Sequence, residues 1–210
     1  MYPPPAGRPS RQCVFLLSPA NCTGKRADLL YNDAARFPLA RRLRADGASL
    51  GEVFSFISGL YFRGKLAYAE RFAIPPPGVI GVQVITTNRG LLAADTLVQI
   101  AELRAFGDGE IRSDNPSYRL PLEQGAAALA RHPSLEVVLL GSIATGKYVD
   151  VLGPPLSTRL LFPVEFVGRG DMSRGALLLR AARAGTELVY QPVEGSVKRG
   201  SRPTRLGAAE

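Results

Sequence analysis

The chain has 210 residues, of which 46% are apolar and 21% are charged, a composition typical of a globular protein and unlike that of a disordered one. Its 26 basic and 18 acidic residues leave a net charge of +8, which favours a polyanionic partner such as DNA. No apolar run approaches the roughly 18 residues that a membrane-spanning helix needs. The proline-rich start lacks the apolar centre of a signal peptide. We therefore expect a cytoplasmic protein with no membrane partner.

The cysteine and histidine content restricts the chemistry further. Cys13 and Cys22 form no Cys-x-x-Cys pair, and we expect no disulfide between them. His132 is the single histidine, so a multi-histidine metal site is excluded. We expect neither a metal nor a cofactor.

The first part of the chain is predicted as a strand followed by two helices. The strand covers 13–18, and the helices cover about 27–45 and 49–73. Ser49 and Glu52 have the spacing of a capping box, in which each side chain binds one free amide of the first helical turn. Three consecutive prolines end the second helix.

Strands and helices alternate along the rest of the chain. Further strands are predicted at 79–87, 135–140, 159–164 and 187–193, and further helices at 95–106, 122–131, 147–152 and 172–184, the last with Gly185 as its C-cap. This alternation predicts a single α/β domain over 12–194, with a mainly parallel sheet of about five strands flanked by helices. We expect residues 1–11 to be a flexible arm and 195–210 a basic, disordered tail.

Four loops that leave the predicted strands share one character, because each combines glycine with Lys or Arg. In chain order they contain Thr23, Gly24, Lys25 and Arg26; Asn88 and Arg89; Ser142, Thr145, Gly146, Lys147 and Tyr148; and Arg169, Gly170, Ser173 and Arg174. The carboxyl ends of parallel strands meet at one edge of a sheet, where ligands bind. We therefore expect an anion site at this edge that binds phosphate or nucleic acid. The alternative is that each loop is an ordinary turn.

The third loop almost matches a P-loop. Gly141, four residues, Gly146 and Lys147 fit the pattern, but Tyr148 stands where a P-loop has the Ser or Thr that binds magnesium. No later apolar strand ends in the aspartate that such a site also needs. We therefore predict a strand-to-helix anion loop of another kind.

Three residues are candidates for catalysis. Asp95 and Asp171 could supply a carboxylate, although either could equally cap a helix. Cys22 lies near Lys25 and Arg26, which would lower the pKa of its thiol and favour a nucleophile; the alternative is an inert small residue. Four aromatic residues could stack on a base: Tyr31, Tyr61, Phe62 and Tyr148.

Several segments together resemble a bacterial domain family of unknown function that is related to the YaaA peroxide-stress proteins. The segments are LLSPANCTGKR to LLYNDAARF (16–37), VITTNRGLLAADTLV (84–98), Lys147-Tyr148 and FPVEFVGRGDMSRGALL (162–178). The resemblance implies DNA binding in response to oxidative damage, and a fold similar to that of base-handling enzymes such as glycosylases. One departure affects the chemistry, because the family usually has His where this chain has Arg89.

These observations leave three functions open. The first is a DNA-directed protein of repair, stress or defence type that acts on a base or its N-glycosidic bond, with Asp95 and then Asp171 as the candidate acids. The second is a DNA-binding module without catalysis. The third is an enzyme that acts on a free nucleotide or nucleoside and holds its phosphate with the Gly-Lys loops.

Overall fold

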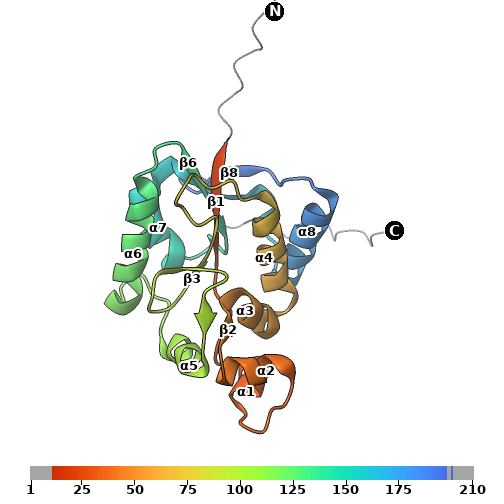
Figure 1. Cartoon of the computed structure of the whole chain (residues 1–210). Helices are drawn as coiled ribbons and strands as arrows, with labels where there is room; N and C mark the ends of the chain where they lie inside the picture. Colours follow the sequence, from red (N-terminus) through yellow and green to blue (C-terminus); the bar gives the residue numbers. More distant parts are fainter. Residues whose placement is uncertain (1–10, 198–199, 201–210) are drawn as a thin grey trace, which may run out of the picture.

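The computed structural model describes residues 11–197 and residue 200, and within them it contains a six-stranded sheet of order β4-β3-β1-β6-β7-β8. The four inner strands are parallel: β3 (Val82–Ile85), β1 (Gln12–Leu17), β6 (Leu135–Leu140) and β7 (Leu160–Pro163). The edge strands β4 (Leu91–Ala93) and β8 (Tyr190–Pro192) are antiparallel to their neighbours. The predicted α/β fold with a mainly parallel sheet is confirmed (Figure 1).

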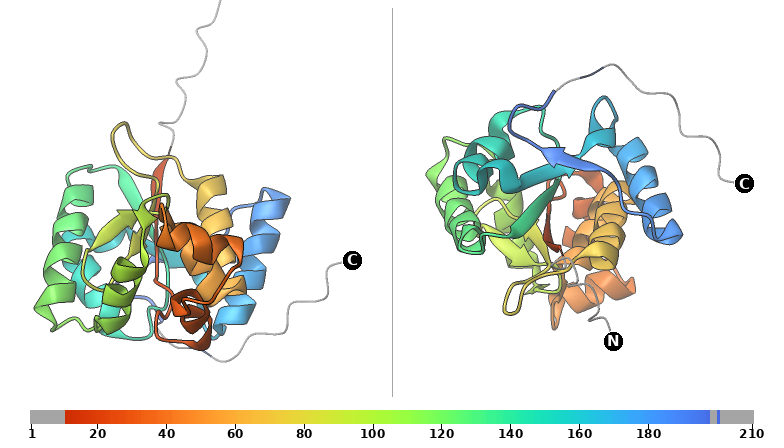
Figure 2. Two further views of the ribbon diagram at one scale, coloured as in Figure 1. Left: turned by 60° about the horizontal axis from the view of Figure 1, so that its bottom comes forward. Right: turned by 90° about the horizontal axis from the view of Figure 1, so that it is seen from above.

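Helices cover both faces of the sheet. α4 (Leu60–Phe72) and α8 (Asp171–Ala184) pack on one face, and α6 (Pro116–Ala130) and α7 (Gly146–Leu156) pack on the other (Figure 2). Side chains of β1 alternate between the two cores, since Phe15 belongs to the first and Leu16 to the second. A strand with both faces buried is uniformly apolar, which explains why CVFLL was recognisable in the sequence.

Both long helices predicted in the first part of the chain are divided in two. The segment 27–45 forms α1 (Lys25–Tyr31) and α2 (Pro38–Arg44), because Pro38 keeps the preceding residue extended and starts a new helix. The segment 49–73 is interrupted at Gly59, whose φ of 64° ends α3 (Leu50–Ser58) and precedes α4.

The middle of the chain also differs from the prediction. A hairpin joins β3 to β4, and β5 (Leu97–Val98) pairs with β2 (Ala48–Ser49), so α5 starts later than expected and covers Ile100–Asp108. At Ser49 only half of the predicted capping box forms, because the Glu52 carboxylate pairs with Arg42 instead. A complete capping box forms between Gln99 and Glu102 at the start of α5.

Later helices are longer than predicted. α6 starts at Pro116 because the Asn115 side chain accepts a hydrogen bond of 3.1 Å from the Ser117 amide. α7 continues through two prolines to Leu156, whose side chain is fully buried against the sheet. Short 3-10 turns follow at Ser157–Arg159 and Val164–Phe166. The predicted C-cap of α8 is confirmed, since Gly185 has left-handed backbone angles.

The backbones of α4 and α8 approach closely at two glycines. A methyl group on Gly64 would lie 2.5 Å from the carbonyl oxygen of Gly175. A methyl group on Gly175 would lie 2.7 Å from the carbonyl oxygen of Leu60 and 2.8 Å from the Cα of Tyr61. The crossing therefore requires glycine at both positions.

Most of the two predicted flexible ends lies outside the described residues, namely 1–10, 198–199 and 201–210. Arg11, the last residue of the predicted arm, is described and pairs with Glu136 and Glu187. Within the described part of the chain, no helix combines the length and apolar character needed to cross a membrane.

Candidate functional site

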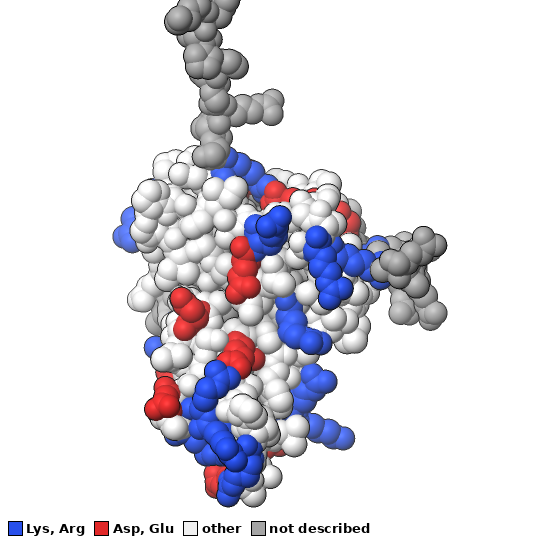
Figure 3. All heavy atoms as spheres, turned by 45° about the vertical axis from the view of Figure 1, so that its right-hand side comes forward, with Lys and Arg blue, Asp and Glu red and all other residues white. Residues whose placement is uncertain are grey.

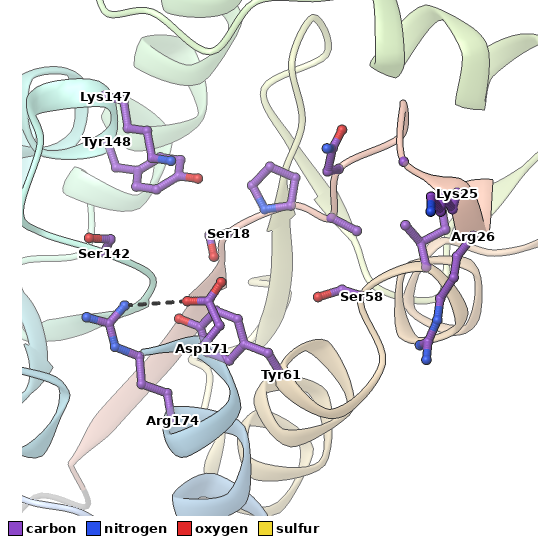
Figure 4. Close-up of a pocket in the computed structure, with 15 residues that line it drawn as sticks. Ser18, Lys25, Arg26, Ser58, Tyr61, Ser142, Lys147, Tyr148, Asp171 and Arg174 are labelled. Atoms are coloured by element: carbon purple, nitrogen blue, oxygen red, sulfur yellow. Dashed lines mark ion pairs between the residues drawn. The ribbon is translucent and has the colours of Figure 1, made fainter. Parts of the chain in front are cut away.

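A cavity of about 410 Å³ lies at the carboxyl ends of β1, β6 and β7 (Figure 4). It brings together parts of three of the four predicted loops. These contribute Gly24, Lys25 and Arg26 after β1; Ser142, Lys147 and Tyr148 after β6; and Asp171 and Arg174 after β7. The end of α3 and the start of α4 close the cavity with Ile57, Ser58 and Tyr61.

The second predicted loop does not join this site. It is the turn of the β3–β4 hairpin rather than a strand-to-helix connection. Its side chains are used within the fold, because Asn88 donates to the carbonyl of Ala105 at 3.1 Å and Arg89 pairs with Glu102. The loop leaves the predicted edge of the sheet, because β3 is parallel to β1, but the prediction that Asn88 and Arg89 join the anion site was wrong.

The cavity is strongly basic. Lys25, Arg26, Lys147 and Arg174 contribute positive charge, and Asp171 is the one acidic side chain among the described lining residues. Arg174 is held in place by the carbonyl of Phe166, which accepts two of its N–H groups at 3.2 and 3.0 Å. Its guanidinium lies 3.9 Å from the carboxylate of Asp171. An anion that enters the cavity would thus meet a fixed guanidinium.

Asp171 is not the helix cap that the sequence allowed. Gly170 is the N-cap residue of α8, and Asp171 is the first helical residue, with no capping hydrogen bond. Its side chain is 73% exposed and faces the cavity beside Arg174 (Figure 4). The carboxylate is therefore free to contact a ligand.

Two buried tyrosine hydroxyls also face the cavity (Figure 4). The residue Tyr61 is 93% removed from solvent, and its hydroxyl lies near Arg174 and Ser18 but makes no hydrogen bond of good geometry within the described residues. Burial raises the pKa of Tyr61 to about 12, while nearby Arg174 opposes the shift. Burial likewise raises the pKa of Tyr148. Both hydroxyls therefore remain protonated at neutral pH and can donate a hydrogen bond to a ligand.

A serine and a fully buried lysine lie at the floor of the cavity. The Lys65 ammonium donates to the hydroxyl of Ser18 at 2.9 Å and also to the Ser18 carbonyl. Burial lowers the pKa of Lys65 to about 7; Asp171 opposes this shift, and Lys147 and Arg174 add to it. No pattern in the sequence marked Ser18 or Lys65, because residues 47 positions apart along the chain meet only in the fold.

Two of the three predicted catalytic residues are not in the cavity. Cys22 is buried, and burial raises the pKa of its thiol to about 12, the opposite of the predicted direction. Its environment favours the neutral thiol because desolvation outweighs the distant cations. Asp95 lies in the turn between β4 and β5, beside a separate cavity that includes Glu70.

The remaining predicted residues flank the cavity without lining it. Thr145 is the N-cap of α7, and Gly146 is its first residue. Thr23 donates to the side chain of Asn21. Arg169 donates to the hydroxyl of Ser173 at 3.2 Å.

Of the four aromatic residues predicted to stack on a base, two line the cavity and two do not. Tyr61 and Tyr148 line the cavity, whereas Phe62 is fully buried in the core. The hydroxyl of Tyr31 donates to the carbonyls of Cys22 and Leu103.

The near-match to a P-loop does occupy a strand–loop–helix unit, from β6 to α7. Tyr148, in the position of the magnesium-binding residue, is buried with its ring toward the cavity. Gly141 allows the Ser18 side chain to approach, since a methyl group there would lie 3.2 Å from the Ser18 Cβ. Among the described residues, no group of three or more His, Cys, Asp or Glu side chains could hold a metal ion.

Comparison with known proteins adds no further constraint, because no protein-family model, curated protein or solved structure matches this chain.

Proposed function

We propose that the cavity binds a nucleotide and holds its phosphate between Lys147 and Arg174. One observation supports this most: residues of the first turns of α7 and α8 line the cavity together with the buried Tyr61 hydroxyl, which makes no hydrogen bond of good geometry in the part of the chain that the structure describes. No side chain caps either helix, since neither Thr145 nor Gly170 makes a capping hydrogen bond. A phosphate here would accept hydrogen bonds from free amides, two cationic side chains and a hydroxyl.

The remaining lining residues suit the rest of a nucleotide. The cavity volume of about 410 Å³ lies within the range of small-molecule sites. Ala20 and Ile57 offer apolar surface to a base or sugar. Asp171 can accept a hydrogen bond from a sugar hydroxyl or a base amino group, whereas its negative charge would repel a free phosphate ion beside it. This combination favours a nucleotide over free phosphate.

Calorimetric titration with mononucleotides, the matching nucleosides and inorganic phosphate tests the proposal. We expect nucleotides to bind and nucleosides to bind far more weakly. Lys147→Ala should weaken nucleotide binding by roughly 10- to 100-fold, which corresponds to the usual free-energy contribution of a hydrogen bond to a charged group. Arg183→Ala is the matched control, because Arg183 is exposed in the last turn of α8, away from the cavity. Equal binding of nucleosides and nucleotides would contradict the proposal.

A groove beside the cavity favours a second candidate, a nucleic-acid strand rather than a free nucleotide. The groove has a volume of about 750 Å³ and shares Arg26 with the cavity. Arg42 and Arg63 line it together with Phe37 and Phe56, whose rings stack with centroids 5.3 Å apart. Figure 3 shows Lys and Arg side chains gathered over the lower end of the molecule, which carries α1 and α2. Basic and aromatic side chains along a groove suit single-stranded nucleic acid.

Oligonucleotides distinguish the two candidates. A single-stranded oligonucleotide should bind more tightly than a mononucleotide if the groove is used, and Arg63→Ala should weaken only the oligonucleotide. The affinity should also fall steeply with salt concentration. Chemistry on a base or its N-glycosidic bond, which the resemblance to YaaA-related domains suggests, would then depend on Asp171 rather than on Asp95, because only Asp171 lines the cavity.

A further inference from the structure

The floor of the cavity contains a serine paired with a buried lysine, which the binding of a nucleotide alone would not require. Ser18 follows the last residue of β1, and its hydroxyl lies 2.9 Å from the Lys65 ammonium nitrogen. Lys65 is 1% exposed and comes from α4, below the level of the cavity. A lysine that only bound phosphate would be placed at the surface of the cavity, as Lys147 is. Lys65 instead contacts a potential ligand only through Ser18.

We propose that Ser18 is a nucleophile and Lys65 its general base, and that together they transfer a phosphoryl group from a phosphoanhydride of the bound nucleotide. The substrate class rests on the proposed function, because the cationic cavity must bring the phosphate to Ser18. The nucleophile itself rests on the separate geometry of the serine and the lysine.

The local hydrogen bonds allow the required proton transfer. The Ser18 hydroxyl lies 3.2 Å from the carbonyl of Leu140 and 2.9 Å from the Lys65 nitrogen, so rotation of its hydrogen can redirect it to a neutral amine. The second hydrogen bond of Lys65, to the Ser18 carbonyl, fixes the direction of the amine. A serine paired with a lysine in this way is a known arrangement for an activated nucleophile.

The surroundings of Lys65 favour the neutral amine that a base requires. The pKa of Lys65 is lowered to about 7, mainly by desolvation; Asp171 opposes the shift, and Lys147 and Arg174 add to it. The rings of Tyr61 and Phe62 face the Lys65 nitrogen, with centroids 4.4 and 4.7 Å away; they exclude water from it, while their cation–π attraction opposes the loss of its proton. A substantial fraction of Lys65 is therefore unprotonated at neutral pH, whereas an exposed lysine is almost fully protonated.

The transfer proceeds in two balanced steps. In the first, the Ser18 oxygen bonds to phosphorus, the hydroxyl proton passes to Lys65, and the anhydride P–O bond breaks. The leaving phosphate departs as an anion on the side of phosphorus opposite Ser18 and needs no proton, and the cationic side chains that line the cavity stabilise it. In the second, water attacks the phosphoserine, Lys65 returns its proton to the Ser18 oxygen, and dihydrogen phosphate is released.

Labelling with diisopropyl fluorophosphate tests the nucleophile directly. The probe reacts at phosphorus and releases fluoride, and it is uncharged, so its reaction does not depend on the proposed anion site. We expect a single adduct on Ser18, located by peptide mass spectrometry and absent in Ser18→Ala. Lys65→Met should slow the labelling by about 100-fold or more, as expected for loss of a general base. The rate should fall about tenfold per pH unit below about pH 7, because protonated Lys65 cannot accept a proton.

Two neighbouring serines serve as matched controls. Ser58 and Ser142 also line the cavity but make no contact with Lys65 within hydrogen-bond distance. An adduct on either of them, no adduct at all, or labelling of Ser18 that is unchanged in Lys65→Met would overturn the proposal. Thermal unfolding of each variant shows whether it is folded. Nucleotide binding without any Ser18 adduct would leave the proposed function intact and reject the nucleophile alone.

Discussion

The buried lysine gives the protein a pH-dependent stability that can be calculated from the structure. The pKa of Lys65 falls from an ordinary value of 10.5 to about 7 because the side chain is fully buried. Between these two pH values the unfolded chain binds one more proton at this residue than the folded chain does. The free energy of unfolding therefore rises with pH over this window, and the gain is absent below it.

The magnitude follows from the width of the window. A difference of one bound proton changes the free energy of unfolding by about 1.4 kcal/mol per pH unit. Between about pH 7 and about pH 9.5 the contribution of Lys65 should therefore rise by about 3 kcal/mol. In Lys65→Met this contribution is absent, whereas those of the cysteines and tyrosines remain.

Urea denaturation of both proteins at several pH values provides the test. The quantity to compare is the free energy of unfolding of the wild type minus that of Lys65→Met, because this difference cancels the other titrating groups. The difference should increase by about 3 kcal/mol in favour of the wild type as the pH rises through this window. A difference that is constant with pH would show that Lys65 keeps its proton in the folded state, and it would refute both this reasoning and the role of Lys65 as a base.

Two further predictions concern the core around the site. Gly175→Ala should destabilise the protein by roughly 1–3 kcal/mol, because the added methyl group would overlap the backbone of α4; Gly153→Ala, where no atom lies within 4 Å, is the control in thermal unfolding. Cys22 should resist iodoacetamide at pH 8 in the folded protein and react rapidly once the chain is unfolded, because burial raises the pKa of its thiol to about 12. Rapid alkylation of Cys22 in the folded state, measured by mass spectrometry, would support the thiolate that the sequence suggested.

Residues with a local signal were predictable from the sequence. The strand β6 was predicted with its observed bounds, because a run of apolar residues between polar segments marks a strand buried on both faces. The breaks at Pro38 and Gly59 were also encoded locally, but the helical periodicity around them concealed the signal. All four basic loops could be assigned to one edge because parallel strands determine where their ends lie, and three of them line the cavity.

The rest of the candidate site depends on contacts between distant segments. Tyr61 was predicted only as one of four aromatic residues that could stack on a base, and its position in the cavity follows from the packing of α4 against α8. The reactivity predicted for Cys22 was wrong because burial, which decides its pKa, is not visible in the neighbouring cations. The loop of Arg89 leaves the predicted edge but does not line the cavity, because its strand turns back as a hairpin instead of leading into a helix.

The glycine crossing between α4 and α8 has a consequence for how ligand selectivity could change. α4 carries Tyr61, and α8 carries Asp171 and Arg174, so the two helices hold neighbouring walls of the cavity. A larger residue at Gly175 would separate these walls without altering any side chain that meets the ligand. The accepted ligand size can therefore be adjusted by a substitution within the helix pair, provided that the rest of the fold tolerates the loss of stability. Directed evolution toward a bulkier ligand would have a route that leaves the chemistry of the cavity unchanged.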